Sequence, residues 1–481
     1  MTELKGRLGS RLAGLAPLLA AWLALAAYGV TLVREPVWGD GAEFGLQIYQ
    51  LGVTHPPGYP VYILLGKLTN LLVPEPALAA NLLSAVAGAL AVGLLAQIAW
   101  QLTGEAWAGL LAALILAFSP HIWDSAVSAE VHNVNLCLLG LALLLMVTWE
   151  RRPASRRLVL AAAMFGLSLG TYLANALLAP AFAWLIWQKR ERWLGRLLLF
   201  GVVVAVVGGL VLSWTYFRAG AVLPLGVQTL PTSPRGFLAY LTGSQYGTTR
   251  LQPLPFYLRR IVEHGRTFGH AFWWLGVPLG LVGLACQWRE QRPIAAALLI
   301  AFVLDLGYFT GYVADDYATM VNPAYFIFAL WIAWGLHALA RWPRRRPGLL
   351  LAGALGGLVA VGLFASQFGP RLERSRQTPV TTFVQSAFAL FPPRAVVLAE
   401  WVKYTPLLYF QRVHGLRPDV TLVERSELPR CYAFGTVADW RDYARRSAAQ
   451  GPVLVDNAHI LAPPGCGLAP AGERWYRLLC P

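Results

Sequence analysis

Long apolar runs without a charged residue are the feature that most limits what this chain can fold into. The first run covers residues 12–33, between Arg11 and Arg34. A helix of about 20 apolar residues crosses the hydrocarbon core of a bilayer. Only 13% of the 481 residues are charged, whereas soluble domains average about 25%. We therefore expect a mainly α-helical, polytopic membrane protein, and the composition excludes a cytosolic globular enzyme and a disulfide-rich secreted scaffold.

Further runs of this kind predict about eleven transmembrane helices. They lie at residues 12–33, 78–100, 106–119, 131–149, 157–171, 174–188, 196–214, 271–287, 293–312, 322–340 and 348–367. Segment 157–188 is ambiguous, because it can form two short helices or one long tilted helix. A single helix there would invert the topology of everything that follows.

Basic residues are grouped between the apolar runs, which predicts the orientation by the positive-inside rule. Lys5, Arg7 and Arg11 precede the first helix, and further clusters lie at residues 151–157, 189–196, 289–292 and 341–346. With eleven crossings all of these face the cytoplasm. The N-terminus is then expected inside the cell membrane and the C-terminal residues outside it. The same clusters account for the net charge of +15, so membrane lipids rather than nucleic acid are the expected partners.

The predicted topology divides the chain into a transmembrane domain, residues 1–370, and an external domain, residues 371–481. External loops are expected at residues 34–77 and 215–270. The external domain contains the β-like runs 395–399, 420–424 and 451–456 between helix-like stretches, which indicates a small α/β domain. Cys431, Cys466 and Cys480 lie in this domain and allow one disulfide with three alternative pairings.

The first external loop carries the residues that point to chemistry. Asp40 and Glu43 are three residues apart, a spacing that places both carboxylates on one face of a helix. His55 adds a third titratable side chain, and the Pro-Pro-Gly-Tyr-Pro run after it restricts the backbone. A rigid loop suits a site that holds reacting groups closely. The alternative is an ordinary interfacial loop in which the two acids only cap the next helix.

Several motifs resemble those of a bacterial family of polytopic membrane proteins. The most specific is Asp40-Gly-Ala-Glu-Phe44, followed by His55-Pro-Pro-Gly-Tyr-Pro60. Weaker matches are the stretches 128–135, 242–246, 314–317, 322–325, 404–409 and 415–420. That family resembles a eukaryotic transmembrane protein O-mannosyltransferase, and both belong to the GT-C superfamily of glycosyltransferases. The chain departs from the family pattern at Thr54, where relatives often have Ala, and at His132, where the usual residue is Tyr.

The resemblance implies an inverting transfer of a sugar from a polyprenyl-phosphate donor to an acceptor hydroxyl at the outer face of the membrane. Mannose is suggested by the eukaryotic relative, and the acceptor can be a protein, a glycan or a lipid. By position in the motif, Asp40 is the general base and Glu43 assists it. The residues expected to bind substrate are His55, Tyr59, Glu130, His132, Gln245, Tyr246, Arg259, Arg260, Arg266 and Asp316.

Two questions stay open at the level of the sequence. The external His and carboxylate residues suit a divalent cation, Mn or Mg, but no His-Glu-x-x-His spacing identifies a metal site. The alternative function is a lipid or solute transporter, or a flippase, without transferase activity. Inverted repeats and charges in the middle of the membrane would favour a transporter, whereas the charges of this chain gather at the helix ends.

Overall fold

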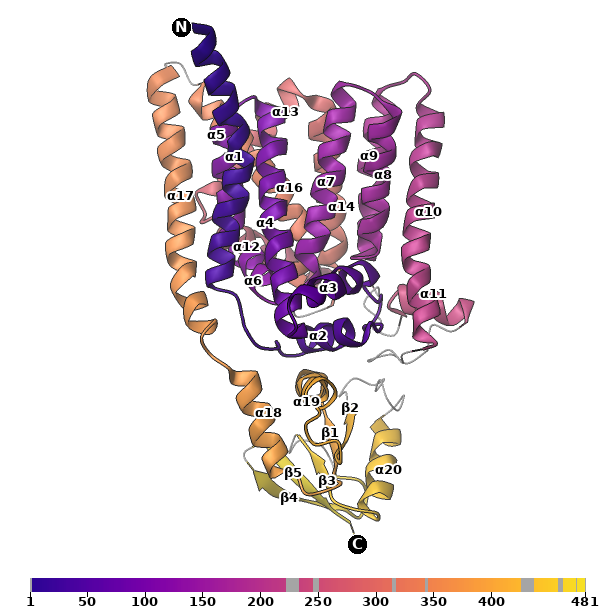
Figure 1. The fold of residues 1–481 in the computed structure, drawn as a ribbon. Coiled ribbons are helices and arrows are strands. Elements are labelled where there is room, and N and C mark those ends of the chain that lie inside the picture. Colours follow the sequence, from indigo (N-terminus) through magenta and orange to yellow (C-terminus); the bar gives the residue numbers. More distant parts are fainter. Residues whose placement is uncertain are drawn as a thin grey trace. The chain divides into compact units, whose positions relative to one another are not determined.

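The computed structural model describes residues 2–221, 233–244, 251–313, 317–341, 345–424, 437–456, 462–472 and 474–480. The chain divides into two compact units. The first comprises Met1–Leu32, Leu82–Ser213 and Thr248–Ser375, and the second comprises Val33–Asn81, Trp214–Gly247 and Arg376–Pro481. Three segments that are distant in the sequence therefore build each unit. Figure 1 labels the helices and strands of both.

The first unit is a bundle of helices (Figure 1). Its elements are α1 (Thr2–Val30), α4 (Pro76–Thr103), α5 (Ala106–Ala117), α6 (Pro120–Val127), α7 (Val131–Arg151), α8 (Ser155–Leu169), the 3-10 helix η1 (Leu173–Leu178), α9 (Ala179–Gln188), α10 (Trp193–Ala219), α12 (Leu254–Ala271), α13 (Gly276–Glu290), α14 (Arg292–Thr310), α15 (Tyr317–Met320), α16 (Asn322–Ala340) and α17 (Arg345–Arg374). The first residues of α4 and the last residues of α10 belong to the second unit.

Among the described residues, six helical stretches are long and apolar enough to cross a membrane, and up to eight if two bent pairs each form one span. The bent pairs are α5 with α6, at 67°, and α12 with α13, at 100°. The protein is thus a multi-pass membrane protein. Each of the eleven apolar runs predicted from the sequence coincides with a helix. Segment 157–188 is broken at η1 into two helices, α8 and α9, so the single long helix is excluded.

Small residues let two helices of the first unit approach closely. A Cβ on Gly283 of α13 would lie 1.7 Å from the carbonyl oxygen of Trp331 in α16. A Cβ on Gly335 of α16 would lie 2.1 Å from the carbonyl oxygen of Leu279. Helices in membranes associate through such close backbone packing, because burial of apolar side chains gives little advantage over lipid. These two glycines therefore permit α13 and α16 to pack together.

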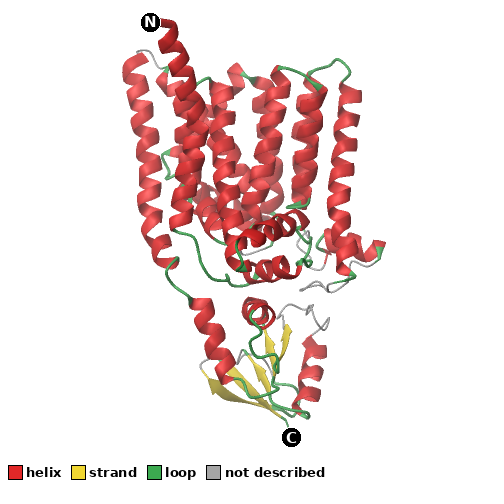
Figure 2. Cartoon of the chain, in the orientation of Figure 1, coloured by secondary structure: helices red, strands yellow, loops and turns green. Residues whose placement is uncertain are grey.

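The second unit is an α/β structure whose strands form one five-stranded sheet (Figure 2). The strands are β1 (Val396–Ala399), β2 (Thr421–Glu424), β3 (Val453–Val455), β4 (Gly467–Gly472) and β5 (Trp475–Leu479), in the order β2-β1-β3-β5-β4. The helices are α2 (Asp40–Gln50), α3 (Pro60–Leu72), α11 (Pro234–Leu241), α18 (Pro379–Leu390), α19 (Trp401–Val413) and α20 (Val437–Ala448). Strand β1 pairs in parallel with β2 and β3, and β5 pairs antiparallel with β3 and β4.

The three β-like runs of the sequence are confirmed as β1, β2 and β3. The hairpin of β4 and β5 was not predicted, because its residues include Pro470 and two glycines and lack a clear alternation. A disulfide between Cys466 and Cys480 joins the ends of this hairpin, which settles the pairing that the sequence left open. Cys431 lies outside the described residues.

The core of the second unit joins the first loop to the C-terminal residues. Ala42 and Leu46 of α2 are buried in the same cluster as Leu407 and Tyr409 of α19. Glu35 adds a polar connection, since its carboxylate accepts hydrogen bonds from the N–H groups of Val380 and Thr381 at the start of α18, at 3.1 and 2.9 Å. A carboxylate at this position satisfies the free N–H groups of the helix N-terminus.

Candidate functional site

The candidate site begins at the first turn of α2. Asp40 and Glu43 both lie in this turn, after Gly39, whose φ of 65° is in the left-handed region. The Thr405 hydroxyl of α19 donates a 2.7 Å hydrogen bond to the Gly39 carbonyl oxygen. Acidic residues in a first turn interact favourably with the helix dipole. The expected arrangement of the two carboxylates on one helix is confirmed, and both also contact residues distant in the sequence.

Glu43 is completely buried and bonded to His55. Its Oε1 accepts the backbone N–H of His55 at 2.7 Å, and its Oε2 lies 2.5 Å from Nδ1 of the same residue. Burial raises the pKa of Glu43, and the attraction and hydrogen bonds of His55 oppose this rise. A buried carboxylate is tolerated when it is hydrogen-bonded in this way. Because its side chain has no exposed surface, Glu43 acts on its surroundings through His55.

Asp40 is the accessible carboxylate of the pair, with 47% of its side chain exposed. Its Oδ1 accepts a 2.6 Å hydrogen bond from the indole N–H of Trp401, and its Oδ2 lies 3.6 Å from Nε2 of His55. The ring of Trp401 also meets the ring of His55 edge-on, with centroids 6.0 Å apart. The side chains of Trp401, Asp40, His55 and Glu43 therefore form one continuous polar cluster.

The loop that carries His55 is fixed from several sides. The buried Tyr240 hydroxyl of α11 donates a 2.5 Å hydrogen bond to the Thr54 carbonyl oxygen. Gly58 has a φ of 97°, and a Cβ there would lie 2.8 Å from that same hydroxyl. The ring of Tyr59 packs edge-on against Phe44 and His55. The proline-rich run predicts a rigid loop. Tertiary contacts restrict this loop in addition to its own backbone conformation.

Arg218 fixes the other end of α2. Its guanidinium donates hydrogen bonds to the carbonyl oxygens of Leu51 and Gln50, at 2.5 and 3.1 Å. The last carbonyls of a helix have no partner within the helix, so a cation that bonds them stabilises the helix end. Both ends of α2 are therefore held by side chains from distant parts of the second unit.

The remaining predicted substrate-binding residues are distributed elsewhere. Glu130 and His132 lie in the first unit, with Oε2 and Nε2 3.9 Å apart. Arg259 and Arg260 of α12 both approach Glu263, at 3.6 and 3.2 Å, and Arg260 also lies 3.5 Å from the ring centroid of Tyr317. Arg266 is exposed. Gln245, Tyr246 and Asp316 lie outside the described residues.

The chemistry of the cluster suits a divalent cation. One ligand atom each of Asp40, Glu43 and His55 can be chosen so that all three lie within 4.8 Å of one another. Two carboxylates and an imidazole are a donor set that Mn or a similar first-row cation accepts. The close contact between Glu43 and His55 already uses part of that donor set, so a bound cation would compete with their hydrogen bond.

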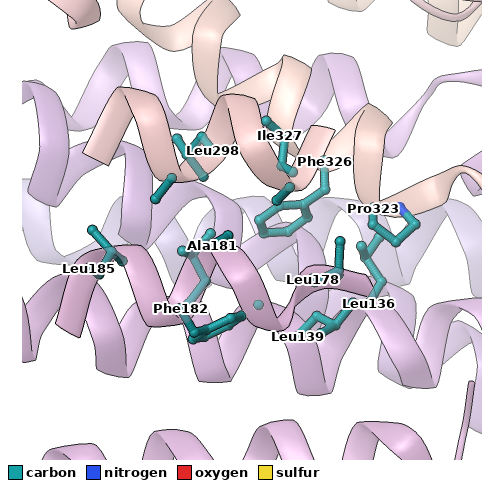
Figure 3. Close-up of a pocket in the computed structure, with 14 residues that line it drawn as sticks. Leu136, Leu139, Leu178, Ala181, Phe182, Leu185, Leu298, Pro323, Phe326 and Ile327 are labelled. Atoms are coloured by element: carbon teal, nitrogen blue, oxygen red, sulfur yellow. The ribbon is translucent and has the colours of Figure 1, made fainter. Parts of the chain in front are cut away.

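A separate cavity lies among the helices of the first unit. It has a volume of about 50 Å³ and is lined by side chains of α7, η1, α9, α14 and α16. Figure 3 shows Leu136, Phe182, Leu298 and Phe326 around it. All of its lining residues are Leu, Ile, Phe, Ala, Gly or Pro. Such a cavity suits hydrocarbon and offers no side chain that could bind a sugar or a phosphate.

Trp401 and Tyr240 are site residues that the sequence did not reveal. The neighbouring Tyr404 begins one of the weaker motif matches, residues 404–409, which does not include Trp401. A signal for Trp401 does exist, because this residue lies two positions after the end of the β-like run 395–399. In a parallel sheet, residues at the carboxyl ends of strands are placed to contact ligands.

Comparison with known proteins identifies relatives of part of the chain. Residues 40–194 match a family model described as the Protein O-mannosyl-transferase TMEM260 N-terminal domain. Mouse protein O-mannosyl-transferase TMEM260 is 33% identical over 236 residues, which are 47% of this chain and 33% of the mouse protein. The Dictyostelium discoideum protein of the same name is 29% identical over 26% of this chain and 16% of its own length. The chain matches a third or less of the length of these relatives.

Solved structures share the fold over almost the whole chain. ArnT from Cupriavidus metallidurans, bound to undecaprenyl phosphate, has a TM-score of 0.64 at 13% identity, with 96% of this chain and 97% of that chain covered. An oligosaccharyltransferase from Archaeoglobus fulgidus, in complex with Zn and sulfate, has a TM-score of 0.58 at 14% identity, with 92% and 68% covered. Together these likenesses confirm the predicted GT-C fold and the resemblance to O-mannosyltransferases.

Proposed function

We propose that this chain is a GT-C glycosyltransferase that moves a sugar from a polyprenyl-phosphate donor to an acceptor hydroxyl. Mannose is the first candidate sugar, since the curated relatives are named O-mannosyl-transferases. The observation that carries the proposal is the half-exposed Asp40 carboxylate, held by Trp401 and adjacent to the His55–Glu43 pair. The match to the TMEM260 family model begins at this same residue.

Asp40 is the proposed general base. The acceptor oxygen attacks the anomeric carbon while the bond from that carbon to the phosphate oxygen breaks, so the configuration inverts in one displacement. The acceptor proton passes to Oδ2 of Asp40, and the electron pair of the broken bond leaves with the lipid phosphate. A carboxylate is a weak base, so its contribution comes from orienting the hydroxyl and taking the proton late in the transition state.

His55 and Glu43 are proposed to hold the Asp40 carboxylate in a fixed orientation. The imidazole lies between the two carboxylates, with Nδ1 toward Glu43 and Nε2 toward Asp40. A protonated imidazole in this position reduces the repulsion between the carboxylates. Glu43 fixes the orientation of the ring, as the buried acid of a catalytic triad does for its histidine. Tyr59 packs against the same ring and is assigned to substrate binding at the edge of the site.

The donor has two parts that require different surroundings. Its hydrocarbon suits apolar surroundings, such as the side chains that line the cavity of the first unit. Its phosphate requires positive charge as the bond breaks. Arg259 and Arg266 are exposed on α12, and Arg260 lies beside them, so we assign the phosphate to this group of arginines. Two structural neighbours, ArnT from Cupriavidus metallidurans and AglB from Archaeoglobus fulgidus, were solved with undecaprenyl phosphate and a dolichol-phosphate, respectively, which supports a lipid of this class.

The acceptor is proposed to be a protein, a glycan or a lipid with a free hydroxyl. Glu130, His132, Gln245, Tyr246 and Asp316 are assigned to sugar or acceptor contacts. If a divalent cation binds Asp40, Glu43 and His55, it would supply positive charge to the departing phosphate. The topology proposed for the cell membrane has eleven crossings, a cytoplasmic N-terminus and an external C-terminal α/β domain, residues 371–481.

The test uses the full chain in proteoliposomes loaded with polyprenyl-phosphate mannose labelled in the sugar. Separate assays offer a Ser/Thr-containing peptide, an oligosaccharide and water as acceptors, and the anomeric configuration of the product is read by NMR. Transfer with inversion supports the proposal. Movement of the labelled lipid between leaflets without sugar transfer to any acceptor would instead identify a flippase.

A further inference from the structure

The C-terminal α/β structure contributes a side chain directly to the candidate site. Trp401 is the first residue of α19, and its indole N–H donates to Oδ1 of Asp40 at 2.6 Å. Both residues belong to the second unit, although 361 positions separate them in the sequence. A hydrogen bond between an N–H and a carboxylate at this distance is of the charge-assisted kind.

The sheet fixes the turn of α19 that presents Trp401. Glu400 is the N-cap residue that precedes α19, and its N–H donates to Oδ2 of Asp456 at 3.0 Å. Asp456 follows β3, its side chain has no exposed surface, and it also bonds the Lys403 ammonium at 3.2 Å. Because β1 and β3 are parallel neighbours, these contacts tie the first turn of α19 to the carboxyl edge of the sheet.

The contact from Trp401 distinguishes the two oxygens of Asp40. Oδ1 is occupied by the indole N–H, whereas Oδ2 faces Nε2 of His55 at 3.6 Å, beyond hydrogen-bond distance. The indole ring also contacts the His55 ring edge-on. A carboxylate held at one oxygen has a fixed plane, so its other oxygen has a defined direction.

We propose that Trp401 is a positioning residue for sugar transfer, which holds Oδ1 of Asp40 so that Oδ2 receives the acceptor proton. This inference rests on the proposed function. It assigns to the C-terminal structure a part in the chemical step, beyond covering the site. Its effect is expected on kcat, because a misdirected oxygen weakens proton transfer in the transition state and leaves donor binding unchanged.

The experiment compares Trp401→Phe, which keeps an aromatic ring and removes the N–H, with wild type in the proteoliposome assay. Loss of a hydrogen bond to a charged group predicts a fall in kcat of about 10- to 100-fold, with KM for polyprenyl-phosphate mannose unchanged. The matched control is Trp38→Phe, in the same unit, whose ring packs on Phe383 with centroids 5.1 Å apart. It is expected to transfer sugar at the wild-type rate.

A second measurement separates positioning from a general loss of structure. In an Asp40→Ala background, single-turnover transfer with excess enzyme is compared with and without Trp401→Phe. The positioning role predicts no further loss from the second substitution, because the carboxylate it acts through is absent. Wild-type kcat in Trp401→Phe, or an equal loss in the Asp40→Ala background, would overturn the inference. Absence of transfer by the wild-type chain would instead overturn the proposed function.

Discussion

The buried carboxyl group of Glu43 makes two contacts with one residue, His55: Oε1 accepts the backbone N–H at 2.7 Å, and Oε2 lies 2.5 Å from Nδ1. The two contacts fix both the loop that carries His55 and the orientation of its ring. The same imidazole faces Asp40 through its other nitrogen. Glu43 can therefore influence the exposed carboxylate without touching a substrate.

Glu43→Gln is expected to lower transfer strongly, although the residue is enclosed. The amide cannot carry the negative charge that orients the imidazole, so kcat is expected to fall by about 10- to 100-fold, in the range of a lost charge-assisted contact. KM for the polyprenyl-phosphate donor is expected to stay unchanged. Steady-state kinetics in proteoliposomes measures both. A rise in KM without a fall in kcat would show that Glu43 serves binding instead.

The stability of the protein is expected to depend on pH through Glu43. Burial raises the pKa of this carboxyl above its usual value of 4.5. Between pH 4.5 and the pKa of Glu43 in the folded state, the folded protein holds a proton that the unfolded protein has lost. The free energy of unfolding therefore falls as pH rises through this range. Glu43→Gln lacks this titration. Unfolding of both proteins between pH 4 and 8 should show wild type losing stability relative to the variant, and a constant difference would contradict the assignment.

Gly58→Ala tests how tightly the loop after His55 is held. The substitution places a side chain at a φ of 97° and 2.8 Å from the Tyr240 hydroxyl. Gly465→Ala is the matched control in the same unit, because its φ of 83° carries a similar backbone cost with no atom within 4 Å of the added Cβ. Both variants should lose about 1 kcal/mol of stability from the backbone. Thermal unfolding should show a further loss, and reduced transfer, for Gly58→Ala alone.

The Cys466–Cys480 disulfide closes a loop with a sequence separation of 14. A cross-link over a loop of this length stabilises the folded state by about 3 kcal/mol. Cys480→Ala is therefore expected to lower the free energy of unfolding of the second unit by about that amount and to increase proteolysis of the C-terminal hairpin. Cys286→Ala removes a free thiol and serves as the control. Equal proteolysis of the two variants would show that the disulfide adds no stability.

The sequence predicted the helices well, because apolar runs report burial and bilayer contact directly. It also predicted β1, β2 and β3. The side chains of these strands show little alternation between apolar and polar, but each run lies between turn-like segments. The hairpin of β4 and β5 escaped prediction, since Pro470 and its neighbouring glycines are typical of loops. Strand pairing and a disulfide hold these residues in strands. Neither of these can be inferred from a local sequence pattern.

The site was predictable only in part. Asp40, Glu43 and His55 lie within 16 residues of one another, and their spacing and motif identified them together. Trp401, Thr405 and Tyr240 come from distant segments that meet only when α19 and α11 join the first loop in one unit. Such contacts depend on tertiary packing, so no spacing in the sequence indicates them.

The central claim is tested most directly by single-turnover sugar transfer from labelled polyprenyl-phosphate mannose by Asp40→Asn. The account predicts that the rate falls by about 10²- to 10⁴-fold, the range of general base catalysis, while the donor still binds and the protein remains folded. Asp442→Asn in α20 is the control, because Asp442 forms an exposed ion pair with Arg446, and it should react at the wild-type rate. Transfer by Asp40→Asn at the wild-type rate would contradict the account.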